Sequence, residues 1–104
     1  MLPFNLATYT EMGKELGQRL RTQRLAQLLS QEELALRAGL SGSTIKNLES
    51  KGQASLESVL RVVMALGLTH ELQEIFSLKV ESIAQMERAE RPPRRRAPRK
   101  ARAS

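Results

Sequence analysis

The sequence predicts an all-α domain of five short helices, followed by a basic tail that we expect to be disordered. Helix-forming residues dominate, and neither β-branched runs nor Asn-Gly turns mark strands or hairpins. Hydroxyl residues followed by apolar residues at helical spacing recur along residues 10–79. From Arg88 onward the composition changes, because eight cations and three of the four prolines stand there without a large apolar residue.

The first helix is expected to begin at a cap formed by Thr10, with Glu11 favourable near its positive end. Its apolar residues recur at steps of four: Met12, Leu16 and Leu20. Gly13 and Gly17 lower the helix propensity of this segment by about 1 kcal/mol each relative to alanine. These glycines either permit a close contact with another element or simply weaken the first turns.

Two further helices are predicted with clear start and stop signals. Ser30 and Glu33 have the spacing of a capping box, and Gly39 can end that helix in a left-handed conformation. Ser41 caps the next helix, and Gly52 ends it. The residues that we expect to be buried are Leu34, Ala35, Ala38, Ile45 and Leu48.

A fourth helix begins at Ser55 and closes at Gly67, and a fifth is predicted over His70–Lys79. The fourth helix is apolar over more than half of its circumference, which predicts burial on more than one side. Its apolar residues are Leu56, Val59, Leu60, Val63, Met64 and Leu66. A sixth, short helix over Ser82–Ala89 is a weaker expectation. We therefore divide the chain into an N-terminal extension (1–10), a helical domain (11–80), a short helix or linker (81–90) and the tail (91–104).

The net charge of +6 is unevenly distributed along the chain. Residues 88–104 carry a net charge of +7, whereas residues 1–87 carry −1. Within that body, residues 1–51 hold +2 and residues 52–87 hold −3. If the body binds nucleic acid, its first half is therefore the expected face.

The composition argues against several other classes of protein. Cysteine and aspartate are absent and His70 is the single histidine, so we expect no disulfide, metal site, cofactor or His/Asp catalytic relay. An enzyme is the least expected class. The longest apolar run, Val62–Leu68, is too short to span a membrane, and we see no secretion signal. We expect a cytoplasmic protein that does not contact a membrane.

The two helices joined by Gly39, Leu40 and Ser41 have the arrangement of a helix-turn-helix. The second helix of such a unit can enter a DNA major groove, which is about 12 Å wide, with its outer side chains free. Those side chains are small and polar here, which suits close approach to base edges. A helix that begins at Gln31 also directs backbone N–H groups toward a phosphate.

Residues 16–68 resemble the lambda-repressor/Cro (Xre) family. The segments that carry the resemblance are Leu-Gly-Gln-Arg-Leu-Arg, Ser-Gln-Glu-Glu-Leu-Ala, Gly-Leu-Ser-Gly-Ser-Thr-Ile-Lys-Asn-Leu-Glu and Ala-Leu-Gly-Leu. The resemblance covers about half of the chain and implies a five-helix DNA-binding domain, a fold that we take as the expectation for this chain.

The family pattern implies roles for individual residues. Gln31 matches a phosphate-contacting glutamine, and Lys46 lies near the DNA backbone. Positions that read bases in the family are occupied by Gly42, Ser43, Thr44 and Asn47. Gly42 departs from the pattern, because it has no side chain, so DNA shape is expected to carry more of the specificity. Ser41 and Lys51 complete the predicted DNA-binding set. Arg24 and Glu49 match a buried ion pair that ties the first helix to the third.

The segment 52–68 and the Arg/Pro-rich end are similar to HipB-type antitoxins, which repress their own operon and bind a HipA-type kinase toxin. Three functions therefore stay open. The first is a dimeric, sequence-specific regulator, an autorepressor that binds double-stranded DNA at a palindromic operator. The second is a HipB-like antitoxin that also neutralises a HipA-like kinase toxin. The third is an adaptor that binds only proteins.

Two features have more than one interpretation. The stripe of Leu72, Ile75 and Phe76 belongs either to the core or to a homodimer interface. The tail is a solvated, disordered end, a segment that lies along DNA phosphates or reaches into a minor groove, or a docking segment for an acidic partner. Its candidate phosphate contacts are Arg94, Arg95, Arg96, Arg99 and Lys100.

Overall fold

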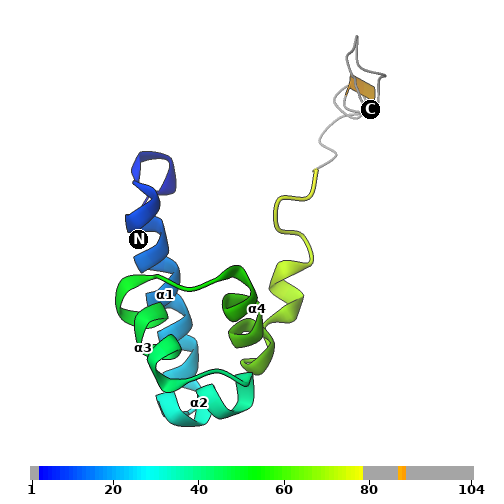
Figure 1. The fold of residues 1–104 in the computed structure, drawn as a ribbon. Coiled ribbons are helices and arrows are strands. Elements are labelled where there is room, and N and C mark those ends of the chain that lie inside the picture. Colours follow the sequence, from blue (N-terminus) through cyan, green and yellow to red (C-terminus); the bar gives the residue numbers. More distant parts are fainter. Residues whose placement is uncertain (1–2, 79–86, 89–104) are drawn as a thin grey trace, which may run out of the picture. The chain divides into compact units, whose positions relative to one another are not determined.

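The computed structural model describes residues 3–78 and residues 87 and 88. They fall into two compact units, Met1–Gln73 and Glu74–Ser104. In chain order, the first unit holds η1 (Phe4–Leu6), α1 (Tyr9–Ala26), α2 (Gln31–Ala38), α3 (Gly42–Lys51), α4 (Leu56–Ala65) and η2 (Thr69–Leu72), as Figure 1 shows. The described residues contain helices and no strands, so the predicted all-α class is confirmed.

The predicted caps of α2, α3 and α4 are present. At α2 the Ser30 hydroxyl accepts the backbone N–H of Glu33, while the Glu33 carboxylate accepts the backbone N–H of Ser30, at 3.0 and 2.8 Å. Ser41 and Ser55 likewise accept N–H groups in the first turns of α3 and α4. Gly39 ends α2 with φ of 71°, the left-handed conformation that a residue without Cβ adopts at low cost.

The start of α1 differs from the prediction. Its N-cap is Thr8, whose hydroxyl accepts the backbone N–H of Glu11 and whose own N–H donates to the Glu11 carboxylate. The physical reason is the spacing of the capping box, because a carboxylate stands three residues after Thr8 whereas Gly13 stands three residues after Thr10. The prediction that Thr10 caps this helix is wrong, and α1 begins inside the segment that the sequence assigned to an extension.

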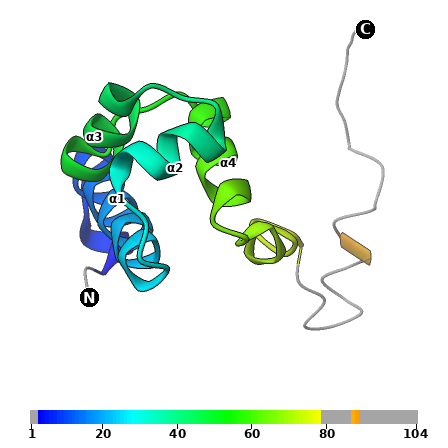
Figure 2. The same cartoon turned by 90° about the horizontal axis from the view of Figure 1, so that it is seen from below.

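The core lies where the helices of the first unit meet. α1 packs against α3, and α2 packs against both α3 and α4. Figure 2 shows α2 lying between α3 and α4. The buried residues that form the core cluster are Leu29, Leu34, Ala35, Ala38, Ile45, Leu48, Val62 and Leu66. No helix of the described residues has the length and apolar character needed to cross a membrane.

Gly17 sets how closely α1 approaches α3. A Cβ atom at this position would overlap the backbone carbonyl oxygen of Leu48 and would lie 3.4 Å from the Cα of Glu49. Of the two interpretations of the glycines in α1, the structure therefore favours a close contact. A larger residue would push apart two helix backbones, which cannot yield as a flexible side chain can.

The helix predicted over His70–Lys79 is wrong for the residues that the structure describes. Thr69–Leu72 forms a single 3-10 turn without a side-chain cap, and Phe76 has φ of 59°, which a right-handed helix does not contain. Ile75 and Phe76 are 52% and 96% exposed. A helix this short depends on packing, which these side chains do not provide. Lys79 and the segment 79–86 of the weaker sixth-helix prediction lie outside the described residues.

The prediction that α4 is buried on more than one side is also wrong. Val62 and Val63 are buried, but Leu56 and Met64 are 73% and 65% exposed. The spacing of the apolar residues predicted the helix correctly. It carried no information on how many other helices pack against α4. The main contact of α4 is with α2 alone, so one apolar face has no cover among the described residues.

We predict that Gly17→Ala destabilises the domain. Alanine favours an isolated helix by about 1 kcal/mol over glycine, but the overlap with the Leu48 carbonyl costs about 1–3 kcal/mol or more. Urea denaturation followed by circular dichroism would measure the difference. Gly42→Ala is the matched control, because a Cβ there meets no atom within 4 Å. Equal stability of the two variants would contradict a close helix contact at Gly17.

Candidate nucleic-acid interface

Helix α3 has a buried arc and an exposed arc. Ile45, Leu48 and Glu49 are buried, and they lie on the side of α3 that faces the rest of the domain. Helical spacing places Ser43, Asn47 and Ser50 on the opposite side. The exposed residues of α3 are Ser43, Lys46, Asn47, Ser50 and Lys51. This outer surface is polar, and its two charged residues are both lysines.

The predicted DNA-contacting residues of α3 divide into two groups. Ser41 and Thr44 bond to each other at the start of the helix, with the Thr44 N–H 3.1 Å from the Ser41 Oγ and the two hydroxyl oxygens 2.9 Å apart. These hydroxyls therefore have a structural task. Ser43 and Asn47 are exposed, lie one turn apart and make no side-chain hydrogen bond to any described residue. Gly42 is the first residue of α3 and offers only backbone.

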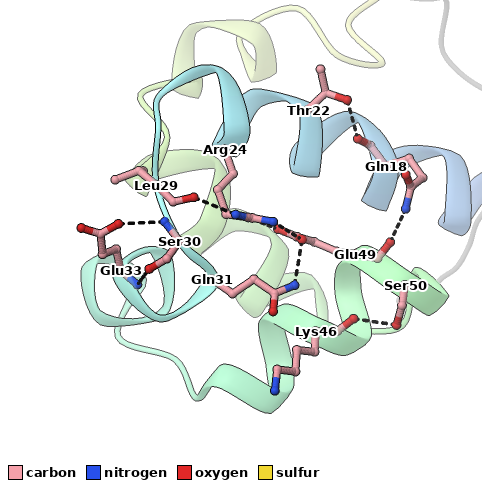
Figure 3. Close-up of polar contacts among 10 residues, drawn as sticks. All are labelled: Gln18, Thr22, Arg24, Leu29, Ser30, Gln31, Glu33, Lys46, Glu49 and Ser50. Carbon is pink, nitrogen blue, oxygen red and sulfur yellow. Dashed lines mark hydrogen bonds and ion pairs between the residues drawn. The ribbon is translucent and has the colours of Figure 1, made fainter.

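The structure contains the predicted pair of Arg24 and Glu49, and both side chains are buried. Two parallel hydrogen bonds join them: Nε of Arg24 donates to Glu49 Oε2 at 2.7 Å, and Nη2 donates to Oε1 at 2.9 Å (Figure 3). Arg24 Nη1 also donates to the backbone carbonyl of Leu29 at 2.7 Å. The guanidinium therefore holds both α3 and the turn that precedes α2.

Both pKa values in this pair favour the charged forms. The hydrogen bond to Glu49 raises the pKa of Arg24 above its usual value. Burial by itself raises the pKa of Glu49, but the hydrogen bonds from Arg24 and Gln31 and the positive charges of Arg24 and Arg21 together outweigh it. The pKa of Glu49 therefore lies below its usual value. The pair is therefore ionised at neutral pH.

Gln31 connects the buried pair to the surface. Its amide nitrogen donates to Glu49 Oε1 at 3.1 Å, and one N–H of the amide group is left for an outside acceptor. Gln31 is also the first residue of α2, where backbone N–H groups point out of the helix. A shallow groove of about 210 Å³ opens beside it. The residues that line this groove are Gln18, Arg21, Gln31, Lys46, Glu49 and Ser50.

Three of the groove residues were missed by the sequence prediction: Gln18, Arg21 and Ser50. Gln18 donates to the backbone carbonyl of Glu49 at 2.7 Å, and the Ser50 hydroxyl donates to the carbonyl of Lys46 at 2.7 Å. Lys46 itself points away from the ion pair (Figure 3). The sequence does hold a signal for Gln18 and Arg21. Gly17 and Arg24 are two turns apart on one face of α1, and residues 18 and 21 lie beside that face.

Other predicted site residues lie away from this surface or outside the described residues. Lys51 is the last residue of α3 and is exposed. Leu72 is half-buried in the first unit, whereas Ile75 and Phe76 are exposed in the second unit. The tail cations Arg94, Arg95, Arg96, Arg99 and Lys100 are outside the described residues. In residues 3–78, 87 and 88, no three His, Cys, Asp or Glu side chains gather as metal ligands would.

We predict that removing one partner of the buried pair costs more than removing both. Arg24→Met leaves Glu49 charged and unpaired in the core, which should lower the free energy of unfolding by about 3–5 kcal/mol at pH 7. Combining Arg24→Met with Glu49→Leu should recover most of this loss, and urea denaturation would measure it. If Arg24→Met alone were as stable as the native chain, the ion pair would not be structurally important.

We also predict that the stability of the native chain depends on pH more strongly than that of the double variant. Because the pKa of Glu49 is lower in the folded chain, the stability it contributes is full above the usual glutamate value of about 4.3 and is lost as pH falls below that value. The native chain should therefore lose more stability between pH 6 and pH 3 than the double variant. Glu33, whose pKa is also lowered by hydrogen bonds from Ser30, is present in both proteins and cancels in the comparison.

The surface therefore combines the exposed polar arc of α3 with a groove at the start of α2 that Arg21 and Lys46 line. In comparisons with known proteins, the model of the Helix-turn-helix family matches residues 20–73, which include all of α2, α3 and α4. A search of curated proteins gives no significant match. The family match covers slightly more than half of the chain and confirms the resemblance to lambda-repressor/Cro (Xre) proteins. The chain belongs to the helix-turn-helix family of the lambda-repressor/Xre type, a family of DNA-binding regulators.

Proposed function

We propose that this chain is a sequence-specific repressor that inserts α3 into the major groove of its operator. The observation that carries the proposal is the exposed arc of α3, where Ser43 and Asn47 have no side-chain hydrogen bonds to described residues. A buried arc holds the helix in place while these groups stay available to base edges. Repression is then steric, because an operator that overlaps a promoter cannot admit the polymerase while it is occupied.

Asn47 is the residue best suited to read a base. Its amide carries both a donor and an acceptor, which together match the N7 and N6 edge of adenine. Ser43, one turn earlier, offers a hydroxyl that suits several bases. Gly42 has no side chain with which to contact a base. Direct side-chain contacts from α3 are therefore expected to cover few base pairs. DNA shape and deformability are expected to supply part of the specificity.

The groove between α1, α2 and α3 is suited to a backbone phosphate. Arg21 and Lys46 line it and supply positive charge, and Gln31 supplies its amide and the N-terminus of α2. Glu49 also lines the groove, but its charge is balanced by the two hydrogen bonds from Arg24. A phosphate held here would fix how deeply and at what angle α3 enters the major groove.

The charge of the body supports the proposal of a dimer. Residues 1–87 carry a net charge of −1, so one helix-turn-helix unit makes few phosphate contacts. Two copies on half-sites one helical turn apart would double these contacts, and their twofold symmetry predicts a palindromic operator. A dimer interface at Leu72, Ile75 and Phe76 and a HipB-like antitoxin role both stay predictions from the sequence.

We predict that Asn47→Ala weakens binding to the specific operator by about 1–3 kcal/mol while leaving nonspecific binding nearly unchanged. Fluorescence anisotropy with DNA from upstream of the gene, at about 0.15 M salt and with excess unrelated DNA, would measure both affinities. Lys46→Ala is the contrasting variant, because losing a phosphate contact should weaken all DNA sequences alike. Equal losses for Asn47→Ala on both DNAs would exclude Asn47 as a base reader.

We also predict that the basic tail steepens the salt dependence of DNA binding. Residues 88–104 carry a net charge of +7, and each phosphate neutralised adds about 0.9 to the slope of log affinity against log salt. A chain that ends at Glu87 should therefore show a shallower slope and keep its preference for the operator. An unchanged slope would place the tail away from DNA.

A further inference from the structure

Three side chains of α1 form a ridge on the side of this helix that borders the groove. Lys14, Gln18 and Arg21 stand at steps of four and three, so they share one face of α1, and all three are exposed. We call these three residues the α1 ridge. Gln18 and Arg21 line the groove beside Gln31. Lys14 lies one turn before Gln18 and extends the same face beyond the groove.

The α1 ridge runs beside α3 because the two helix backbones approach closely. A Cβ atom at Gly52, the residue that ends α3, would overlap the backbone of α1 at Lys14. One turn later along α1, Gln18 donates to the backbone carbonyl of Glu49 at 2.7 Å (Figure 3). The ridge therefore follows α3 from its C-terminal end toward its middle, and Gln18 holds the two helices in this register.

The cations of residues 3–78 are divided between ion pairs and this side of the molecule. Arg19, Arg24 and Arg61 are each paired with a glutamate. The cations without an ion pair among the described residues are Lys14, Arg21, Arg37, Lys46 and Lys51. All of these except Arg37 belong to the α1 ridge or to the exposed residues of α3. Positive charge without an acidic partner is therefore concentrated where α1 and α3 lie side by side.

The carboxylates of α1 lie away from the ridge and are already engaged. Glu11 accepts the backbone N–H of Thr8 at 2.9 Å, and Glu15 pairs with Arg19 at 2.9 Å. Helical spacing places both glutamates on the side of α1 that is turned away from α3. An anion that follows the ridge therefore meets two cations and no carboxylate on that face of α1.

We propose that the α1 ridge is a second contact line for the DNA backbone, along which Lys14 and Arg21 neutralise separate phosphates of one strand. The proposal rests on the part of the proposed function in which α3 enters the major groove, because a helix inserted there has a sugar–phosphate strand along its side. Lys14 and Arg21 are seven residues apart, which is about 10 Å along α1. Phosphates of one strand recur about every 3.4 Å along the DNA axis, so the ridge spans about three of them.

The connection after α3 supplies no charge that could replace the ridge. Residues 52–55 contain no charged side chain, and the next cation after Lys51 lies in α4. Lys51 is turned by about 100° around α3 from Ser50, which lines the groove. Lys14 is therefore the cation that continues the line from Arg21 past the C-terminal end of α3.

The first test is the salt dependence of DNA binding by the full chain, on DNA from upstream of the gene and on an unrelated duplex. Lys14→Gln and Arg21→Gln should each reduce the slope of log affinity against log salt by about 0.9, and the double variant by about 1.8, on both DNAs. The basic tail is the same in all variants, so it cancels in these differences.

Arg37→Gln is the matched control, because Arg37 is also exposed and without an ion pair among the described residues but lies beside α4. It should leave the slope unchanged, and circular dichroism would verify that every variant folds. If Lys14→Gln changes the slope no more than Arg37→Gln does, the ridge is not a contact line.

A second test locates the strand. The chain contains no cysteine, so a single introduced thiol can carry an iron chelate that cleaves the DNA backbone near it. Lys14→Cys and Arg21→Cys should cut the same strand of each half-site in the upstream DNA, at positions about three nucleotides apart. Arg37→Cys is the control and should cut neither strand above background. Cuts on opposite strands, or a Lys14→Cys pattern no stronger than the control, would overturn the proposal.

The ratio of the two affinities distinguishes failure of this inference from failure of the proposed function. Because phosphates carry no sequence information, Lys14→Gln should leave the preference for the upstream DNA unchanged. If the native chain shows no such preference but Lys14→Gln still reduces the slope on both DNAs, sequence-specific repression fails and the contact line stands. If the preference is present and Lys14→Gln has the native slope, the contact line is wrong and the function stands.

Discussion

The buried ion pair between Arg24 and Glu49 is the interaction on which the shape of the candidate nucleic-acid interface depends. Two charges survive in this core because each satisfies the other and further hydrogen bonds occupy the remaining groups. The pair lies at the contact between α1 and α3, where Gly17 lets the two backbones approach closely. Through Gln31 it also orients the start of α2. One cluster therefore fixes three helices relative to one another.

Local signals predicted the middle of the fold well. Ser30, Gly39 and Ser41 act within one helical turn of the residues that they cap, so their effect can be recognised in a short stretch of sequence. One error was local, because the capping box of Thr8 and Glu11 was overlooked in favour of Thr10. The other errors arose where the outcome depends on distant neighbours. The exposure of α4 reflects the lack of a second helix against it among the described residues. Failure of the fifth helix reflects missing packing around Phe76.

The candidate site could be predicted in the same uneven way. The outer residues of α3 follow from helical periodicity, and Arg24 and Glu49 were identified by the resemblance to the family. Arg21 was missed because its place beside Gln31 and Lys46 depends on how α1 crosses α3, which no local pattern encodes. The hydrogen bond of Thr44 was also unexpected. Thr44 stands at a position that reads bases in the family, but its hydroxyl here bonds to the hydroxyl of the capping residue Ser41.

The two arcs of α3 separate the residues that hold the fold together from the residues that we propose to contact DNA. Ile45, Leu48 and Glu49 hold the helix in the domain, whereas Ser43 and Asn47 contribute nothing to the core. Substitutions on the outer arc are therefore almost free of a stability penalty. Under the proposed function, duplicated copies of such a gene can diverge toward different DNA targets while keeping one scaffold. For protein engineering, the same separation means that the DNA specificity proposed for α3 can be changed by replacing a few outer side chains. Ile45, Leu48 and Glu49 have to be kept.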